Sequence, residues 1–124
     1  MRTIGDDTAG FSVNVMSGTV SVRAWGFWGV DVALAFLTTI VEACSTVSGG
    51  ASLVMEMSAL KPMRDEGQKS FSDLIRALPT IGIVRASIAA DSPLTKLQLL
   101  RLATQNAGKC PVKFVASEDL KKAS

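Results

Sequence analysis

A chain of 124 residues with 48% hydrophobic content can bury one core, but it is too short for two ordinary domains. Charged residues make up 19% of the chain, and it carries ten glycines and four prolines, all near globular averages, so we expect disorder only at the N-terminus. Histidine is absent, which removes both the commonest general base and the commonest transition-metal ligand. Tyrosine is absent too. We therefore expect no enzyme, no metal site and no cofactor.

The net charge of +2 is unevenly distributed, with −3 on residues 1–60 and +5 on residues 61–124. The cations of the second half are scattered among Leu and Ala rather than among stacking aromatics, which argues against nucleic-acid binding. The apolar stretch 24–47 is long enough to span a membrane. However, Asp31 and Glu42 lie inside it, and each would cost about 2.5–3.5 kcal/mol in lipid, so we expect no membrane insertion.

The cysteine content and the N-terminus both indicate a cytoplasmic protein. Cys44 lies in an apolar helical run and Cys110 just before a predicted strand, which is typical of reduced, partly buried thiols. The first seven residues contain two acids and no apolar stretch after Arg2, unlike a secretory signal. We expect residues 1–9 to be a flexible N-terminus and residues 10–124 to form one domain.

Alternating apolar and polar residues predict a β-hairpin at the start of this domain. Its strands cover residues 11–15 and 20–24, and Ser17-Gly18 forms the turn. A connector of two glycines and three large rings follows. The rings are either an exposed interaction surface or a lid packed on the core, and they are Trp25, Phe27 and Trp28.

From Val30 the hydrophobic pattern becomes helical, and Asp31 is expected to cap the helix start. The helix is apolar around most of its circumference, which predicts either deep burial or self-association as a homodimer. Ser48-Gly49-Gly50 ends it. The expected buried stripe is Val30, Leu34, Leu37, Val41 and Cys44, extended by Val32, Phe36 and Ile40.

The rest of the chain alternates strands with helices. Strands are predicted at residues 53–57, 83–89 and 112–116, and a terminal helix begins at Ser117. Asp91-Ser92-Pro93 is typical of a helix start. The apolar stripe of the second helix is Phe71, Leu74, Ile75 and Leu78, and that of the third is Leu94, Leu97, Leu100 and Leu102.

The predicted order is β-β-α-β-α-β-α-β-α. Strands separated by single helices must run parallel through right-handed crossovers, while the initial hairpin is antiparallel. The sequence therefore predicts an α/β fold with a mixed, mostly parallel sheet and helices packed on it.

The most informative segment runs from Leu53 to Gly67, where a central apolar strand ends in a charged turn that opens a helix. Functional residues of α/β domains gather at such junctions, because the helix N-terminus presents unpaired N–H groups and a partial positive charge. Asp65 and Glu66 lie at this N-terminus. The hydrophobic stretch 53–57 and the turn that follows it thus predict a functional loop.

The element order and this junction resemble the STAS domain of bacterial anti-sigma-factor antagonists. That family ends its second crossover strand with Asp-Leu-Ser-Gly and begins the next helix with Asp-Ser-Ser-Gly. The corresponding residues here are Glu56-Met57-Ser58-Ala59 and Arg64-Asp65-Glu66-Gly67. The resemblance covers residues 10–124 in element order and implies a STAS-like domain that regulates another protein by binding it.

The departures from the family motif concern the switchable residue. In the antagonists the serine after the motif Asp is phosphorylated, and the corresponding residue here is Asp65, preceded by Arg64. A carboxylate at a helix N-terminus carries about half or more of a phosphoserine's charge, so Asp65 can act as a fixed substitute for phosphate. The alternative is that Asp65 only stabilises the helix start, since acids are favoured there by about 0.3–1 kcal/mol each.

We expect a non-enzymatic, cytoplasmic regulatory domain that binds another protein, such as an anti-sigma factor or a kinase-like regulator. The connector and the turn should share one edge of the sheet. The alternative function is a small-ligand sensor or carrier for a lipid or nucleotide. Candidate binding residues are Trp25, Phe27, Trp28, Asp31, Arg64, Asp65, Glu66, Gly67 and Ser70.

Overall fold

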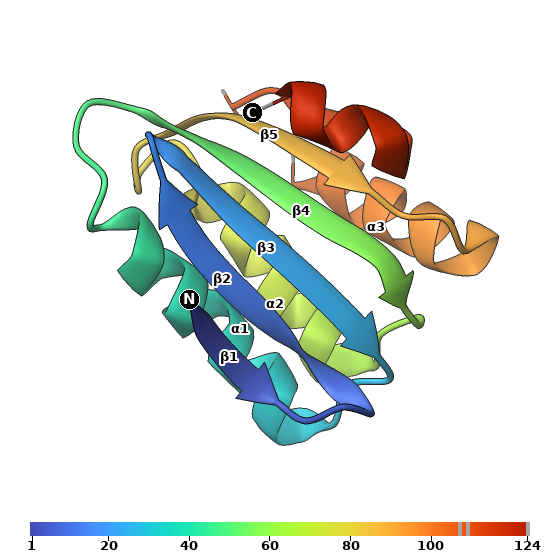
Figure 1. Cartoon of the computed structure of the whole chain (residues 1–124). Helices are drawn as coiled ribbons and strands as arrows, with labels where there is room; N and C mark the ends of the chain where they lie inside the picture. Colours follow the sequence, from blue (N-terminus) through green and yellow to red (C-terminus); the bar gives the residue numbers. More distant parts are fainter. Residues whose placement is uncertain (107, 109, 124) are drawn as a thin grey trace.

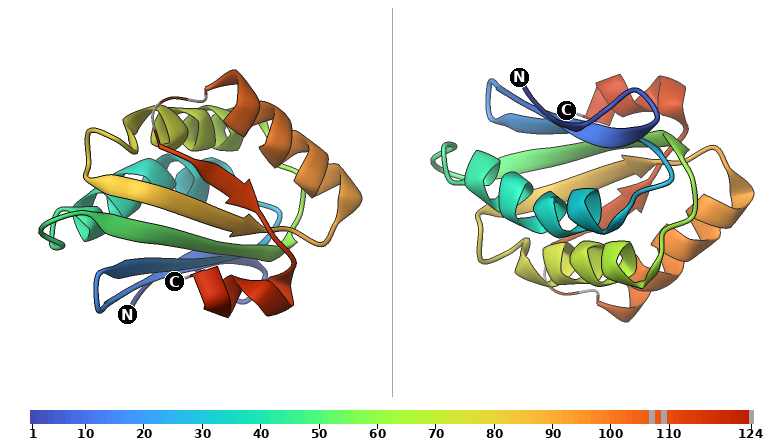
Figure 2. Two further views of the ribbon diagram at one scale, coloured as in Figure 1. Left: turned by 90° about the horizontal axis from the view of Figure 1, so that it is seen from above. Right: turned by 90° about the horizontal axis from the view of Figure 1, so that it is seen from below.

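The computed structural model describes residues 1–106, 108 and 110–123, without the side chains of residues 121–123. A six-stranded sheet carries three α-helices on one face and a 3₁₀-helix on the other (Figures 1 and 2). The elements are β1 (Arg2–Gly5), β2 (Ala9–Met16), β3 (Thr19–Gly26), α1 (Val30–Cys44), β4 (Ala51–Leu60), α2 (Asp65–Ala77), β5 (Ile83–Ala89), α3 (Pro93–Gln105), β6 (Val112–Phe114) and η1 (Ser117–Ala123).

The strands lie in chain order from β1 to β6, so β4 is central as predicted. β1, β2 and β3 pair antiparallel, whereas β3 to β6 pair parallel through the helical crossovers. This arrangement confirms the predicted mixed α/β sheet. β1 was not predicted: residues 1–9 were expected to be flexible, but Arg2–Gly5 pair along β2 and Arg2 forms an ion pair with Glu42 of α1.

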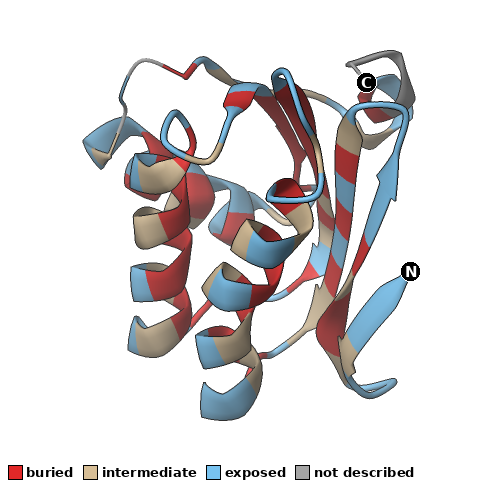
Figure 3. Ribbon diagram, turned by 90° about the vertical axis from the view of Figure 1, so that its left-hand side faces the viewer, coloured by how far each residue is buried: buried red, intermediate tan, exposed pale blue. Residues whose placement is uncertain are grey.

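The main core lies between the sheet and the helical layer, where buried positions of both meet (Figure 3). In α2 the predicted stripe is confirmed, because Phe71, Leu74, Ile75 and Leu78 are all buried. A second, smaller core lies on the opposite face of the sheet. There Leu120 of η1 packs against Val54 and Ala89.

The predicted stripe of α1 was wrong at two of its eight positions, and that of α3 was wrong at three of its four. In α1 the row of Phe36 and Ile40 is buried together with Ala33, Thr39 and Cys44, while Val30 and Leu34 are exposed. In α3 the buried residues are Thr95, Leu99, Leu102 and Ala103, and the exposed residues are Leu94, Leu97 and Leu100. Both helices therefore present apolar side chains to solvent.

None of the helices in the described part of the chain is long and apolar enough to cross a membrane. The apolar stretch 24–47 is instead divided between the end of β3, the connector, α1 and the turn after α1.

Candidate functional site

The connector after β3 and the loop after β4 lie side by side at one edge of the sheet. Trp25 is opposite Ala59 in the parallel register, and the Lys61 N–H donates a hydrogen bond of 3.0 Å to the Gly26 carbonyl. Residues 25–29 and 61–67 thus follow adjacent strands at the same edge of the sheet, and together they are called the loop edge below. The structure brings together the two segments that the sequence singled out.

The three rings of the connector have different environments. Trp28 is 2% exposed, packs against Phe11 and Phe36, and donates a hydrogen bond of 3.0 Å from Nε1 to the Gly10 carbonyl. Trp28 is therefore part of the core. Trp25 is half-buried: its Nε1 donates to the Asp6 carbonyl at 2.7 Å.

Phe27 lies between these two tryptophans in the sequence and is 54% exposed. Gly26, at φ 78°, turns the chain immediately before it, and an added Cβ there would lie 2.0 Å from the Thr8 carbonyl oxygen. The turn thus requires glycine. The result is a large apolar side chain held in solvent on a backbone that is fixed on both sides.

The start of α2, in the other segment of the loop edge, carries three charged residues. Arg64 is the N-cap, with extended backbone and no capping hydrogen bond from its side chain, and Asp65 is the first helical residue. Arg64 and Asp65 are exposed, and Glu66 is partly buried. The Asp65 carboxylate makes no hydrogen bond or ion pair within the described residues, so its interaction with the helix is that of a charge with a dipole.

Gly67 is buried in the first turn of α2, where a Cβ would lie 3.0 Å from the Met63 side chain. This close approach explains a glycine inside a helix, where alanine is otherwise favoured. Met63 in turn is 5% exposed and fixes the loop to the core.

The loop is also held by α3, which the sequence did not predict. The Gln98 amide both accepts from the Met63 N–H at 2.6 Å and donates to the Met63 carbonyl at 2.9 Å. The Thr95 hydroxyl donates to the Leu60 carbonyl at 2.8 Å. A single amide that satisfies both backbone groups of one residue makes this loop rigid.

Two candidate residues have structural roles instead. The Ser70 hydroxyl is buried and donates a 2.6 Å hydrogen bond to the Ala33 carbonyl, joining α2 to α1, so Ser70 does not reach the surface of the loop edge. Asp31 was expected to cap α1, but the N-cap is Gly29. Asp31 is the second helical residue and is exposed in the first turn, where its charge is favourable.

A hollow of about 420 Å³ lies beside the connector, between the β1–β2 turn and the start of α1. Phe27, Asp6 and Asp31 line it, whereas neither connector tryptophan does. The pKa of Asp6 lies below its usual value. The largest cause is the hydrogen bond from the Thr8 hydroxyl, and the Thr8 and Ala9 N–H groups also donate to this carboxylate. Two carboxylates at this hollow disfavour an anionic ligand.

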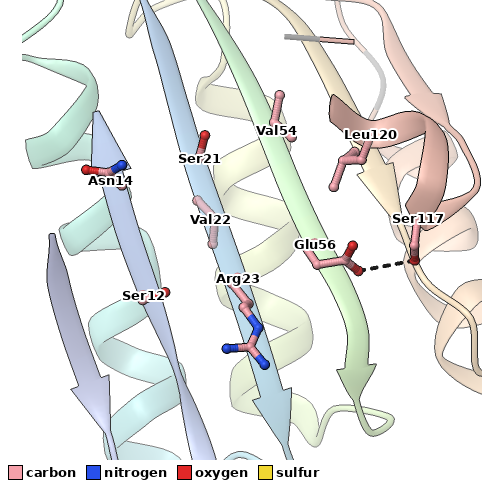
Figure 4. A pocket seen from close by; sticks show the side chains of 9 residues that line it. All are labelled: Ser12, Asn14, Ser21, Val22, Arg23, Val54, Glu56, Ser117 and Leu120. Carbon is pink, nitrogen blue, oxygen red and sulfur yellow. Dashed lines mark hydrogen bonds between the residues drawn. The ribbon is translucent and has the colours of Figure 1, made fainter. Parts of the chain in front are cut away.

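A pocket of about 320 Å³ that was not predicted from the sequence lies on the sheet face opposite the α-helices (Figure 4). The outward residues of β2 and β3 form one wall and η1 the other. Glu56 accepts hydrogen bonds from the Ser58 N–H and hydroxyl and from the Ser117 hydroxyl. The strict alternation of the hairpin could have identified the polar residues that share this face, namely Ser12, Asn14, Ser21 and Arg23.

Comparison with known proteins supports the fold. No protein-family model matches the sequence, and no curated protein matches it either. Among solved structures, the chain is similar to a crystal structure of an anti-sigma factor antagonist from Mycobacterium paratuberculosis, with a TM-score of 0.67 and 17% identity over 96% of each chain. The strand order, the helical layer and this match agree, and the chain has a STAS-like α/β fold.

Proposed function

We propose that this chain is a non-enzymatic regulatory domain that binds another protein through the loop edge. The observation that carries the proposal is the exposed Phe27, which shares the loop edge with the charged start of α2, on a backbone fixed by the Lys61–Gly26 hydrogen bond and by Gln98. Rigid apolar side chains surrounded by charges are typical of interaction hot spots, because little conformational entropy is lost on binding.

The similarity to an anti-sigma factor antagonist supports a protein partner of the anti-sigma-factor or kinase-like class. The free thiols of Cys44 and Cys110 are consistent with a cytoplasmic location.

Asp65 is proposed to act as a fixed negative charge where an antagonist carries its phosphorylated serine. Its exposure and its lack of a hydrogen-bond partner within the described residues support this role, since a charge satisfied by the helix itself would be less able to contact a partner. Stabilisation of the helix start alone remains the alternative.

Affinity purification from the source organism tests the loop edge. We expect Phe27→Ala to lower recovery of the main partner by about 5- to 30-fold, as loss of a hot spot does. Asp65→Ser should also change that recovery. Val84→Ala is the matched control, because Val84 is 58% exposed at the opposite end of the parallel strands. Unchanged recovery with both loop-edge variants rejects the proposal.

Incubation with a cognate kinase tests Asp65. Mass spectrometry should find phosphate on the Asp65→Ser variant at residue 65 and none on the wild-type chain. Phosphate on wild-type Ser58, Ser70 or Ser72 would contradict a fixed-charge role for Asp65.

The alternative, a sensor or carrier of a small ligand, rests on the hollow beside Phe27. Because Asp6 and Asp31 line this hollow and disfavour an anionic ligand, its test is tryptophan fluorescence with added vesicles of uncharged lipid, with a nucleotide as the ligand expected to give no shift. A saturable shift would favour the ligand function over the protein-binding function.

A further inference from the structure

The outer face of α3 carries three leucines that nothing in the described structure covers. Leu94 is 70% exposed, Leu97 63% and Leu100 42%. They recur every third residue, so they form a continuous ridge along one side of the helix. The residues that attach α3 to the domain lie on its other side, where Thr95, Leu99, Leu102 and Ala103 are buried.

This leucine ridge is flanked by the two positive charges of its own helix. α3 contains no acidic residue, and its two cations are Lys96 and Arg101. Arg101 is four residues after Leu97 and Lys96 four before Leu100, so the cations border the ridge on both sides. Neither forms an ion pair within the described residues, although Arg101 donates to the Gln68 amide at 3.2 Å.

The ridge continues into a groove of about 270 Å³ between the end of α3 and β6. Leu100 belongs to both, and the opposite wall contains Val112 and Phe114. β6 is a short edge strand that pairs only with β5 in the described structure. The helix ridge and the groove together form one apolar surface, called the α3 surface below.

We propose that the α3 surface binds an amphipathic α-helix of another protein whose apolar stripe is bordered by Asp or Glu. The spacing of the leucines matches ridges-into-grooves packing of a second helix, whereas β6 has too few residues to template an added strand. Acidic borders on the incoming helix pair with Lys96 and Arg101. This surface is separate from the loop edge and does not depend on the function proposed for it.

The charges of α3 also disfavour two other partners for this surface, a second copy of the chain and an anionic membrane. A symmetric pair of copies would place Lys96 and Arg101 of one chain near the same cations of the other, which is repulsive. An anionic membrane is normally bound by clusters of about four to eight cations, and α3 offers two.

The test is an NMR titration of the full chain with a synthetic peptide of about 18 residues, long enough for five helical turns, that carries a leucine stripe bordered by glutamates. The expected amide shifts occur at Leu94, Leu97 and Leu100. A peptide with lysines in place of the glutamates is the matched ligand control and should bind at least about 10-fold more weakly, because it repels the same cations.

Four variants distinguish binding at the α3 surface from nonspecific hydrophobic binding. Leu97→Ser should weaken peptide binding by about 10-fold, whereas Leu34→Ser, at an equally exposed leucine of α1 that has no neighbouring cations in its helix, should leave it unchanged. The Lys96→Ala, Arg101→Ala double variant should abolish the preference for glutamates without altering the fold. Phe27→Ala should bind the peptide normally.

Equal binding of the two peptides, or shifts that centre outside α3 and β6, would overturn the proposal. Tighter binding to phosphatidylglycerol vesicles than to the glutamate peptide would assign the surface to a membrane. Concentration-dependent shifts at the same leucines without peptide would assign it to a second copy.

Discussion

Replacing Trp28 should destabilise the domain, because this ring is a core residue at the base of the connector. Its ring centroid lies 5.6 Å from that of Phe11 and 4.9 Å from that of Phe36. Removing a buried Trp side chain leaves a large cavity, so Trp28→Ala should lower the free energy of unfolding by about 3–5 kcal/mol. That is a large part of the 5–15 kcal/mol of an ordinary domain, so the variant should be close to unfolding.

Trp28→Phe separates the two contributions of this side chain. A phenyl ring keeps most of the contact with Phe11 and Phe36, but it cannot donate to the buried Gly10 carbonyl. Loss of one hydrogen bond costs about 0.5–1.5 kcal/mol, and we expect a loss of about that size. Phe27→Ala, at the exposed neighbouring ring, should change the free energy of unfolding by less than about 0.5 kcal/mol.

Urea denaturation followed by far-ultraviolet circular dichroism measures all three variants without depending on tryptophan emission. A loss of less than about 1 kcal/mol in Trp28→Ala, or a greater loss in Phe27→Ala than in Trp28→Ala, would contradict a core role for Trp28.

The remaining predictions concern buried groups and assembly. Ser70→Ala should lower the free energy of unfolding by about 1 kcal/mol, since it removes the hydrogen bond to Ala33, while Ser72→Ala, at a half-buried serine of the same helix, serves as control in the same urea assay. Burial raises the pKa of the Cys44 thiol from 9.0 to about 11. Below pH 9 this thiol should not affect stability, and between pH 9 and about 11 stability should fall as pH rises, because only the unfolded state ionises. Cys44→Ala should reduce that fall in unfolding experiments across this pH range, and an unchanged slope would contradict the assignment. Val30 and Leu34 are exposed on α1, so light scattering at high concentration should show self-association that Leu34→Ser weakens, and a monomer throughout would refute this prediction.

Much of the fold could be predicted because its elements follow strong periodicities. The hairpin alternates with period two, and the stripe of α2 has no competing apolar row, so Phe71 and Leu74 were placed correctly. β1 was missed because its four residues carry no alternating apolar pattern, and their pairing to β2 is a tertiary effect.

The errors in α1 and α3 have one physical cause. A helical pattern identifies the buried face by its large aliphatic residues, but both helices bury some small or polar residues and expose some aliphatic ones. Thr95 is buried because its hydroxyl reaches the Leu60 carbonyl, a partner that no helical pattern reveals. The exposed leucines of α3, in contrast, are a feature that only the three-dimensional structure shows.

The topology predicts at which edge of the sheet the candidate site lies, but it does not predict which of its side chains are exposed. The carboxyl ends of neighbouring parallel strands put the connector and the α2 turn at one edge. Which ring of the connector is buried depends on the turn at Gly26 and on the Gly10 carbonyl, both set by the neighbouring β2 strand.

Hydrogen exchange of the chain, alone and with the partner recovered by affinity purification, tests the loop edge most directly. Binding should slow amide exchange in residues 25–29 and 61–67, with little change on the sheet face around Glu56. Protection confined to that face or to α3, with the loop edge unaffected, would contradict the proposed role of Phe27 and Asp65.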